Sequence, residues 1–223
     1  MGVDKTWRKW IEVARKNTKI IDMCATEGLS EVMKGQFLIL EDVQKGLEDY
    51  LETKRNGFAR FYFLSNDELL EILSQTKDPT RVQPFLCKVF EAMAKLTFSP
   101  DNDITQMISP EGESIDMEPF PTRERNVEEW MGSVEDEMCR SIRRVMENAI
   151  VEYEDVERTE WVLQHPAQCI LNGSQKWWTT EVEESFENNS LADYGVQLQE
   201  QIRGLVLLVR GNLTKAMRTT IGA

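Results

Sequence analysis

Residue types that commonly carry catalysis are sparse in this sequence. The only histidine is His165, which immediately precedes Pro166. A Ser–His–Asp arrangement would depend on this residue. It stands where a helical pattern ends, and a histidine there more often interacts with terminal carbonyl groups or solvent. We therefore predict no nucleophilic catalytic site.

Metal ligands are also poorly placed for coordination. The four cysteines lie far apart with no CxxC pair: Cys24, Cys87, Cys139 and Cys169. A zinc site needs several Cys or His ligands at short spacing, so we expect scattered, buried, reduced thiols. One acidic tract resembles a carboxylate metal site, namely Glu181, Glu183, Glu184 and Glu187. No histidine follows at the spacing used by di-iron helices, so a solvated helix face is the preferred interpretation.

Cofactor motifs are missing from the sequence as well. Neither GxxxxGK[ST], which wraps backbone amides around phosphates, nor GxGxxG occurs. The six tryptophans invite the hypothesis of a ligand cage, but their helical spacing favours packing between elements. We accordingly predict no catalytic residues, no cofactor-binding residues, no metal-binding residues and no cofactor.

Charge and hydropathy limit the partners of this chain. Its 223 residues include 26 Lys and Arg against 39 Asp and Glu, a formal net charge of −13. Nucleic acids and anionic membranes attract clustered positive charge, so neither is expected as a partner. The longest apolar run of note, GLVLLV at 204–209, falls far short of the roughly 18 residues of a membrane span.

Helical periodicity dominates the chain. The expected helices cover 4–17, 36–54, 84–96, 126–154, a segment ending near His165, a segment through 170–186, and 191–221. In the second helix, apolar residues recur every three or four positions: Leu40, Val43, Leu47, Tyr50 and Leu51. Asn56–Gly57 is expected to end that helix, because both residues tolerate a left-handed cap.

The stretch FARFYFLSNDELLEIL at 58–73 predicts a joint between elements. Its aromatic run at 59–64 favours a strand, and Ser65 with Glu68 fits a capping box. We predict that replacing either Phe61 or Phe63 by Ala destabilises the protein by about 3–5 kcal/mol.

Two further signals complete the expected joint. Residues 104–118 predict a hairpin turning at Pro110–Gly112, which together with 59–64 would make a small three-stranded sheet. Asn126 and Glu129 predict a second capping box at the start of the long helix.

Together these patterns predict a mainly α fold: an elongated antiparallel helical bundle with a small hairpin or three-stranded sheet around 59–64 and 104–118. Three regions are expected, with 1–57 helical, 58–120 a mixed α/β joint and 121–223 a long-helix bundle. Both ends fall inside helical patterns, so we expect a piece of a longer protein.

Five stretches carry a resemblance to a known family: VQKGLEDYLETKR (43–55), FARFYFLSNDELLEILSQTKDPTRVQPFLCKVFEAMAKLTF (58–98), ISPEGESIDM (108–117), VEEWMGSVEDEM (127–138) and SQKWWTTEVEESF (174–186). In this order they resemble the linker of dynein heavy chains, from about residue 30 to the end. FLSNDELLEIL resembles axonemal more than cytoplasmic dyneins. Ala59 stands where the family usually has proline, and Phe85 where histidine is common, which affects the subtype only.

The resemblance implies a role that the residues alone do not supply. The dynein linker is a helical lever that arches over a ring of AAA+ modules and moves with nucleotide state to deliver the power stroke. This sequence would be its central to C-terminal part, without catalysis of its own. The implied partner is the AAA+ ring of the same heavy chain, with other dynein chains as further candidates, in the cytoplasm and the ciliary or flagellar axoneme.

Two questions stay open at this point. Hinge candidates in such a lever are the Pro119–Pro121 break and the His165–Pro166 junction, where helical patterns are interrupted. The alternative functions are a generic helical scaffold or adaptor that binds a partner helix, and an enzyme whose site the sequence does not reveal. An exposed apolar groove would favour the adaptor.

Overall fold

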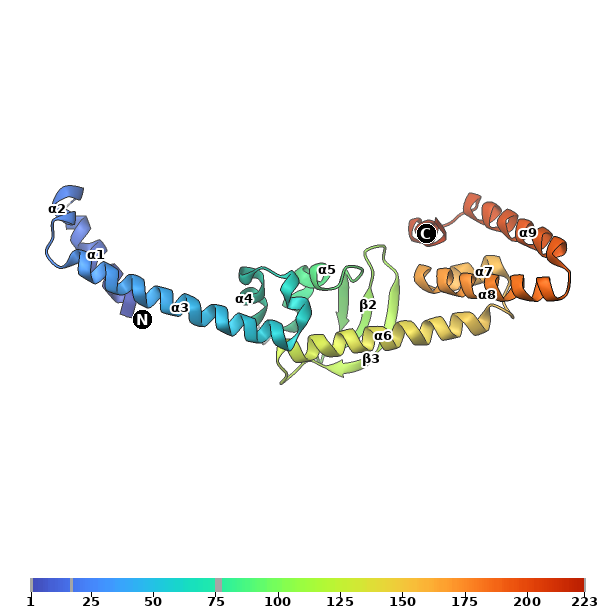
Figure 1. Cartoon of the computed structure of the whole chain (residues 1–223), viewed down its shortest axis with the longest axis horizontal. Helices are drawn as coiled ribbons and strands as arrows, with labels where there is room; N and C mark the ends of the chain where they lie inside the picture. Colours follow the sequence, from blue (N-terminus) through green and yellow to red (C-terminus); the bar gives the residue numbers. More distant parts are fainter. Residues whose placement is uncertain (1, 17, 75–77, 223) are drawn as a thin grey trace. The chain divides into compact units, whose positions relative to one another are not determined.

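The computed structural model describes residues 2–16, 18–74 and 78–222 (Figure 1). Asn17, the last residue of the predicted helix 4–17, lies outside them. The α-helices are α1 (Gly2–Lys16), α2 (Ile20–Cys24), α3 (Leu29–Gly57), α4 (Asn66–Ser74), α5 (Leu86–Val89), α6 (Val127–Glu152), α7 (Arg158–Gln164), α8 (Ala167–Glu187), α9 (Leu191–Arg210) and α10 (Lys215–Gly222). Two 3-10 helices, η1 (Ala59–Phe63) and η2 (Pro79–Phe85), and three strands complete the fold. The predicted mainly α class with a small sheet is confirmed.

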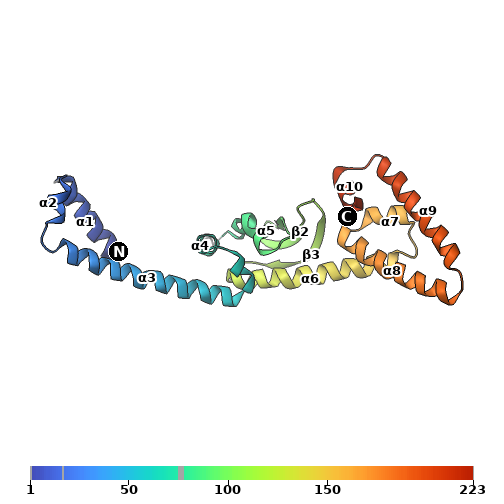
Figure 2. The same cartoon turned by 45° about the horizontal axis from the view of Figure 1, so that its top comes forward.

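The chain divides into two compact units, residues 1–59 and 60–223. The first contains α1, α2 and α3, and α1 contacts α3 (Figure 2). No described residue from 2 to 50 is buried. The apolar set of α3 is exposed over most of its length, at Leu40, Val43, Leu47 and Tyr50. Of that set, Leu51 is buried.

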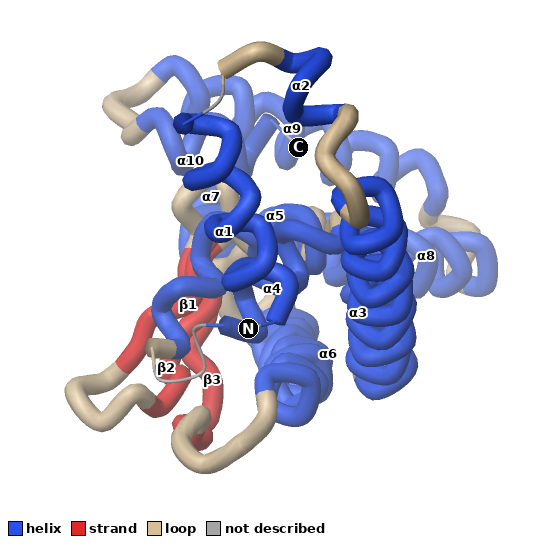
Figure 3. The backbone as a smooth tube through the Cα atoms, turned by 90° about the vertical axis from the view of Figure 1, so that its left-hand side faces the viewer, coloured by secondary structure: helices blue, strands red, loops and turns tan. Residues whose placement is uncertain are grey.

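The sheet of the second unit is an antiparallel meander in the order β1 (Lys95–Phe98), β2 (Asp103–Ile108) and β3 (Ser114–Pro121) (Figure 3). The predicted hairpin at 104–118 is confirmed, because β2 and β3 pair through Met107 and Ile115. Gly112 has a φ of 94° in the connecting turn, a left-handed conformation that favours glycine.

The predicted strand at 59–64 is wrong, because this segment forms the 3-10 helix η1. Phe58, Phe61 and Leu64 are buried, whereas Phe63 is 68% exposed. A spacing of three residues matches the three residues per turn of a 3-10 helix and does not match the alternation of a strand. The aromatic content of this segment had indicated a strand, but the three-residue spacing of its buried side chains fits the 3-10 conformation that the backbone adopts.

The third strand comes instead from β1, in a segment predicted to be helical. Only the four-residue α5 forms within 84–96, and Lys95 already pairs with Ile108. The Gln83 side chain binds the backbone of Leu96 twice, accepting from its N–H at 3.1 Å and donating to its carbonyl at 2.6 Å. These bonds pair both backbone groups of Leu96, which stabilises an edge strand that propensity did not predict.

The long helices differ from the sequence-based expectation at three points, of which the start of α6 is described below. The predicted helix 191–221 is interrupted: α9 ends at Arg210, Gly211 is extended and α10 begins at Lys215. Arg218 closes the interruption by donating to the carbonyl groups of Val209 and Gly211. The helix at Gly57 ends as predicted but through an extended Phe58, without a left-handed glycine.

At the start of α6, the predicted capping box does not form. Asn126 is the N-cap residue, yet its side chain donates to Glu129 Oε1 at 3.0 Å and accepts no backbone N–H.

Two apolar clusters hold the second unit together. One lies between η1, α4, α5, the sheet and the first half of α6, and includes the fully buried Phe61, Leu69 and Ile104. The other joins the end of α6 to α7 and α8 around Ala149, Trp161 and Cys169. Because α6 reaches both clusters, it is the common element of the unit (Figure 1). Among the described helices, none is both long enough and apolar enough to cross a membrane.

Candidate functional site: polar joints between helix and sheet

Glu137 places a carboxylate on the buried face of α6. Trp130, Val134 and Ser141 are buried on this helix, and Glu137 follows Val134 by three residues and precedes Ser141 by four. Positions three and four apart share a helix face, so the sequence of α6 directs Glu137 inward. Its side chain is only 4% exposed. A buried carboxylate is costly unless it is paired and hydrogen-bonded.

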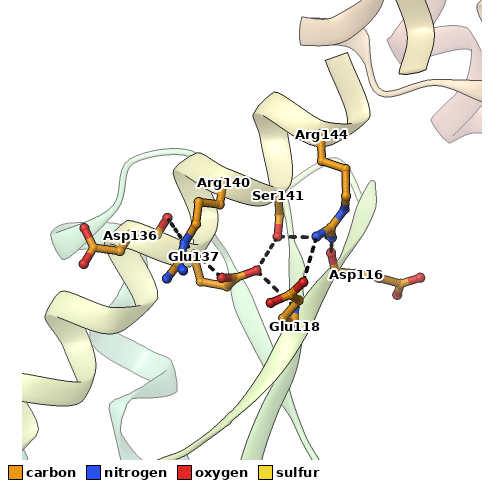
Figure 4. A network of polar contacts seen from close by, with 7 residues as sticks. All are labelled: Asp116, Glu118, Asp136, Glu137, Arg140, Ser141 and Arg144. Carbon is orange, nitrogen blue, oxygen red and sulfur yellow. Dashed lines mark hydrogen bonds and ion pairs between the residues drawn. The ribbon is translucent and has the colours of Figure 1, made fainter. Parts of the chain in front are cut away.

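The partners of Glu137 come from both α6 and β3 (Figure 4). Its Oε1 accepts from the backbone N–H of Glu118 at 3.1 Å and from the Ser141 hydroxyl at 3.0 Å. Its Oε2 lies 3.3 Å from Nε of Arg140. Three partners for one carboxylate compensate its burial, and the bond to Glu118 attaches the helix to the strand.

Arg144 extends this attachment one turn along α6 (Figure 4). Its Nη2 donates to the carbonyl of Asp116 at 2.9 Å and to the Ser141 hydroxyl at 3.4 Å. Its Nη1 lies 4.0 Å from Oε1 of Glu118. We call Asp116, Glu118, Glu137, Ser141 and Arg144 the helix–sheet joint. Directional bonds at two points along β3 oppose both sliding and rotation of α6 on the sheet.

Arg60 makes a second joint, from η1 to α6 and α5. Its Nε donates to Glu135 Oε1 at 2.9 Å and its Nη1 to the carbonyl of Val89 at 3.2 Å. The guanidinium also lies 5.0 Å from the centroid of the Phe90 ring. One side chain thus orients three elements, a role that the planar, five-donor guanidinium suits.

The predicted capping box at the start of α4 is confirmed. Ser65 N–H donates to Glu68 Oε2 at 3.0 Å, and Glu68 N–H donates to Ser65 Oγ at 3.3 Å. Lys88 also pairs with Glu68. The bond from Lys88, followed by that from the Ser65 backbone, lowers the pKa of Glu68 below its ordinary value of 4.5.

Glu113, at the end of the hairpin turn, binds two helices that are distant in sequence. Its Oε1 accepts from the backbone N–H of Ala167 at 3.1 Å and from the Thr220 hydroxyl at 2.6 Å. Ala167 is the first residue of α8, so a carboxylate here is also favoured by the helix dipole. The hairpin therefore holds the start of α8 and part of α10.

The two hinge candidates are placed differently by the structure. Residues 119–121 lie inside β3, where Phe120 and Pro121 pair with β2, so they are no break between helices. His165–Pro166 does connect α7 to α8. His165 Nε2 lies 3.0 Å from Glu152 Oε2, close enough for an ion pair when protonated but not aligned as a hydrogen bond. Glu113 holds the N–H of Ala167 just after this junction, and Glu152 lies beside His165 just before it. The junction is therefore restrained on both sides.

Most tryptophans pack between elements, as predicted. Trp161 is fully buried and donates to the carbonyl of Ala149 at 2.8 Å, and Trp177 donates to that of Ile150 at 2.9 Å. Tyr153 stacks on Trp177 with ring centroids 5.4 Å apart. Trp7 and Trp178 depart from the prediction because both are more than half exposed.

The acidic tract of α8 contains one hydrogen-bonded glutamate and three exposed ones. Glu181 accepts from the Tyr194 hydroxyl at 2.9 Å, whereas Glu183, Glu184 and Glu187 are exposed. No group of three or more His, Cys, Asp or Glu within the described ranges is arranged to hold a metal ion.

The cysteines are free thiols, as expected, but only one is buried. Cys24, Cys87 and Cys139 are exposed, whereas Cys169 is buried. Burial raises the pKa of the Cys169 thiol.

One hollow of about 580 Å³ lies among α7, α8 and α9. Tyr153, Arg158 and Trp177 line it together with several glutamates, and its lining contains no histidine, cysteine or serine. Arg158 occupies part of this region, lying 4.9 Å from the centroid of Trp161 and donating to Ser174.

These features define a class of protein: a mainly helical structural element whose conspicuous polar groups join helices to a sheet. Comparison with known proteins identifies the family. Residues 1–149 match the family model "Dynein heavy chain, N-terminal region 2". The chain belongs to the dynein heavy chain family.

Curated relatives match over nearly the whole chain. "Dynein axonemal heavy chain 1" of Rattus norvegicus is 45% identical over 222 residues, which is 99% of this chain and 5% of the relative. "Dynein axonemal heavy chain 3" of Mus musculus and "Dynein axonemal heavy chain 12" of Homo sapiens are each 43% identical, over 99% of this chain and 6% and 7% of the relatives. The chain thus spans only 5–7% of the length of these relatives.

The match also corrects the expected position of the segment. The sequence had indicated the central to C-terminal part of the linker, whereas the matching model describes an N-terminal region of the heavy chain. Five short stretches established the family in the sequence, but they carried no measure of distance from the start of so long a protein.

Proposed function

We propose that this segment is part of the mechanical linker of an axonemal dynein heavy chain. It docks on the AAA+ ring of the same heavy chain and changes its arrangement with nucleotide state, which drives microtubule-based movement of cilia and flagella. ATP hydrolysis belongs to the ring, and the segment itself contributes no catalysis. The axonemal assignment is supported by 43–45% identity to relatives that are named as axonemal heavy chains.

The observation that carries the proposal is the helix–sheet joint. A lever transmits force only if its elements keep their angles under load. Glu137 binds the backbone N–H of Glu118 in β3, and Arg144 binds the backbone carbonyl of Asp116. Because the strand contributes backbone groups, rotation of a side chain on the strand cannot break these bonds. Packing alone permits small sliding of helices, whereas directional hydrogen bonds resist it.

A binding experiment tests the lever proposal. The 223-residue chain is added to an AAA+ dynein ring that lacks its own linker, without nucleotide and with ADP or an ATP analogue. We expect binding whose affinity differs between nucleotide states. Absence of binding in every state, or equal binding in all of them, would contradict the proposal.

A matched pair of variants connects binding to the joint. Glu137→Gln removes the buried charge at the joint, and Asp136→Asn makes the same change at the neighbouring residue, which is exposed. We expect the first variant to weaken the nucleotide dependence of binding and the second to preserve it. Circular dichroism verifies that both variants retain their helices.

A further inference from the structure

The second half of α9 is apolar on both its inner and its outer side. The inner side packs against α7 and α8, where Leu205 and Leu208 contact the apolar cluster around Trp161 (Figure 2). The outer side exposes Val206 and Leu207, and Leu207 is 62% exposed. A helix on a protein surface is normally polar on its outer side, and one that is apolar all round is normally buried. The outer side of α9 is therefore expected to have a covering partner.

Two arginines lie within this outer side. At about 100° per residue, Arg210 and Arg203 lie about 40–60° from Val206 in one direction, and Ile202 lies about 40° from it in the other. Leu207 follows about 40–60° beyond the arginines. These five side chains line a shallow hollow of about 410 Å³, together with one glutamine and no acidic residue. The two arginines are thus flanked by apolar side chains on both sides.

Neither arginine is neutralised within the part of the chain that the structure describes. There, the side chains of Arg203 and Arg210 form no ion pair and no hydrogen bond, although the sequence contains 39 Asp and Glu. The acidic residue of α9 that is nearest in sequence, Glu200, lines the larger hollow among α7, α8 and α9 instead. Charges across an interface are arranged to be complementary, so two unpaired cations within an apolar face favour a partner that supplies carboxylates.

We call Ile202, Arg203, Val206, Leu207 and Arg210 the arginine face of α9. We propose that this face binds an amphipathic α-helix that carries two carboxylates seven residues apart within its own apolar face. Seven residues span about 10.5 Å along a helix, which is also the separation of Arg203 from Arg210, and each guanidinium can then bind one carboxylate.

Two other occupants fit this face less well. The arginine face of a second copy would bring the same two cations, and like charges at an interface repel. An anionic membrane would meet the surroundings of this face in a chain of net charge −13, whereas a helix meets the face alone. The inference does not depend on the lever function, since it involves neither the helix–sheet joint nor nucleotide.

Three synthetic helical peptides test the proposal on the complete 223-residue chain. All share one leucine face over three heptads. The first carries two Glu seven residues apart within this face, the second carries Lys at these positions, and the third carries the two Glu on the opposite face. By fluorescence anisotropy, we expect the first to bind with a dissociation constant of about 10–100 μM at low salt, to weaken as salt is added, and to bind at least about tenfold more tightly than the others. Equal binding of all three, or no binding of the first, would overturn the proposal.

Variants locate the binding on α9. Arg203→Glu and Arg210→Glu should each weaken binding of the first peptide by about tenfold or more and strengthen binding of the Lys peptide. Arg143→Glu on α6 is the matched control, since Arg143 is also an exposed arginine on a helix. An equal loss of binding in the Arg143 control would refute the assignment to α9. Glu137→Gln should leave peptide binding unchanged, which separates this test from that of the lever. Circular dichroism verifies that the variants retain their helices.

Sedimentation separates the proposed occupant from the other two. Analytical ultracentrifugation of the chain alone measures self-association, and dimers that Arg203→Glu dissociates would replace the partner helix with a second copy. Cosedimentation with vesicles of phosphatidylserine and phosphatidylcholine measures membrane binding, and binding that Arg203→Glu abolishes would replace the helix with a membrane. A monomer that stays in the supernatant and binds the first peptide supports the proposal.

Discussion

Phe61 and Phe63 differ by two positions in sequence and almost completely in exposure. Phe61 is fully buried in η1, whereas Phe63 is 68% exposed. We expect Phe61→Ala to lower the free energy of unfolding by about 3–5 kcal/mol, because it empties a closed position in the core. Phe63→Ala should change it by no more than about 0.5 kcal/mol, which revises the equal effects expected from sequence.

Urea denaturation of the two variants checks this pair. The midpoint should fall for Phe61→Ala and stay near that of the unchanged protein for Phe63→Ala. Equal shifts in the two variants would mean that the 3-10 spacing does not determine which aromatic ring is buried.

The carboxyl group of Glu68, at the beginning of α4, makes the stability of the protein depend on pH. Its pKa is lowered in the folded state, chiefly by Lys88. Because a lowered carboxyl pKa favours folding above its unfolded value, this stabilisation is present at neutral pH. It is lost as the pH falls below 4.5 and through the folded value. We expect Glu68→Gln to lower stability at pH 7 and to have less effect at pH 3.

A double-mutant cycle isolates this contribution. Thermal unfolding is measured between pH 3 and pH 7 for Glu68→Gln, Lys88→Met and the double variant. In the Lys88→Met background, Glu68→Gln should have a smaller effect at pH 7, because the principal cause of the pKa shift has been removed. An effect of Glu68→Gln that does not vary with pH would show that the carboxyl charge is unimportant there.

At the scale of elements, Glu137 attaches α6 to β3. Glu137→Ala removes the acceptor for the Glu118 N–H and the Ser141 hydroxyl. Leaving such donors without a partner costs about 1–3 kcal/mol, so we expect a loss of that size in unfolding free energy. Asp136→Ala, at an exposed position on the same turn, should cost less than about 0.5 kcal/mol.

Chemical denaturation compares these two variants, and hydrogen exchange tests the attachment itself. Amide exchange at Glu118 should accelerate in Glu137→Ala and stay unchanged in Asp136→Ala. If the Glu118 amide is equally protected in both, the joint does not hold the strand.

Replacing glycine by alanine is expected to have opposite effects on stability in α8 and in α9. A Cβ added at Gly173 would lie 3.0 Å from Cζ2 of the fully buried Trp161 ring, whereas one added at Gly195 would meet nothing within 4 Å. Gly173→Ala should therefore destabilise the protein by about 1–3 kcal/mol through overpacking. Gly195→Ala should stabilise it by about 0.5–1 kcal/mol, the usual gain for Ala over Gly within a helix.

The sign of the effect separates the two glycines. Differential scanning calorimetry should give a lower melting temperature for Gly173→Ala and a higher one for Gly195→Ala. An increase for both would show that α7 and α8 can move apart to admit the methyl group.

At the scale of the whole molecule, burial is distributed unequally along the chain. No described residue between 2 and 50 is buried, whereas α6 contains seven buried residues. Segments with few buried contacts open easily, so the backbone amides of residues 2–50 should exchange within the shortest labelling times. Those of α6 from Val127 to Ala149 should be the slowest. Hydrogen exchange with mass spectrometry checks this order, and strong protection of 2–50 would contradict it.

Local signals in the sequence predicted much of the second unit. The capping box of Ser65 and Glu68, the hairpin around Gly112 and the long helix from Val127 all depend on contacts between near neighbours in sequence. Such contacts form wherever the segment is placed, so a sequence pattern is sufficient to predict them. The three-part division into 1–57, 58–120 and 121–223 stays a prediction.

The joints could not be predicted in the same way. Glu137 appears in sequence as one more acidic residue on a helix, and its position on the apolar face was its one available signal. Glu113 and Arg60 bind groups 54 and 75 residues away, at Ala167 and Glu135. No spacing rule connects residues that distant.

By itself, the sequence determined the mainly helical class, the hairpin, the α4 cap and the resemblance to dynein heavy chains, since periodicity, turn residues and ordered motifs are local properties. Only the tertiary structure decided that 59–63 is a 3-10 helix, that β1 completes the sheet and that Glu137 is buried. The physical reason is that burial and strand pairing depend on which distant surfaces meet, and local propensity yields when those contacts are stronger.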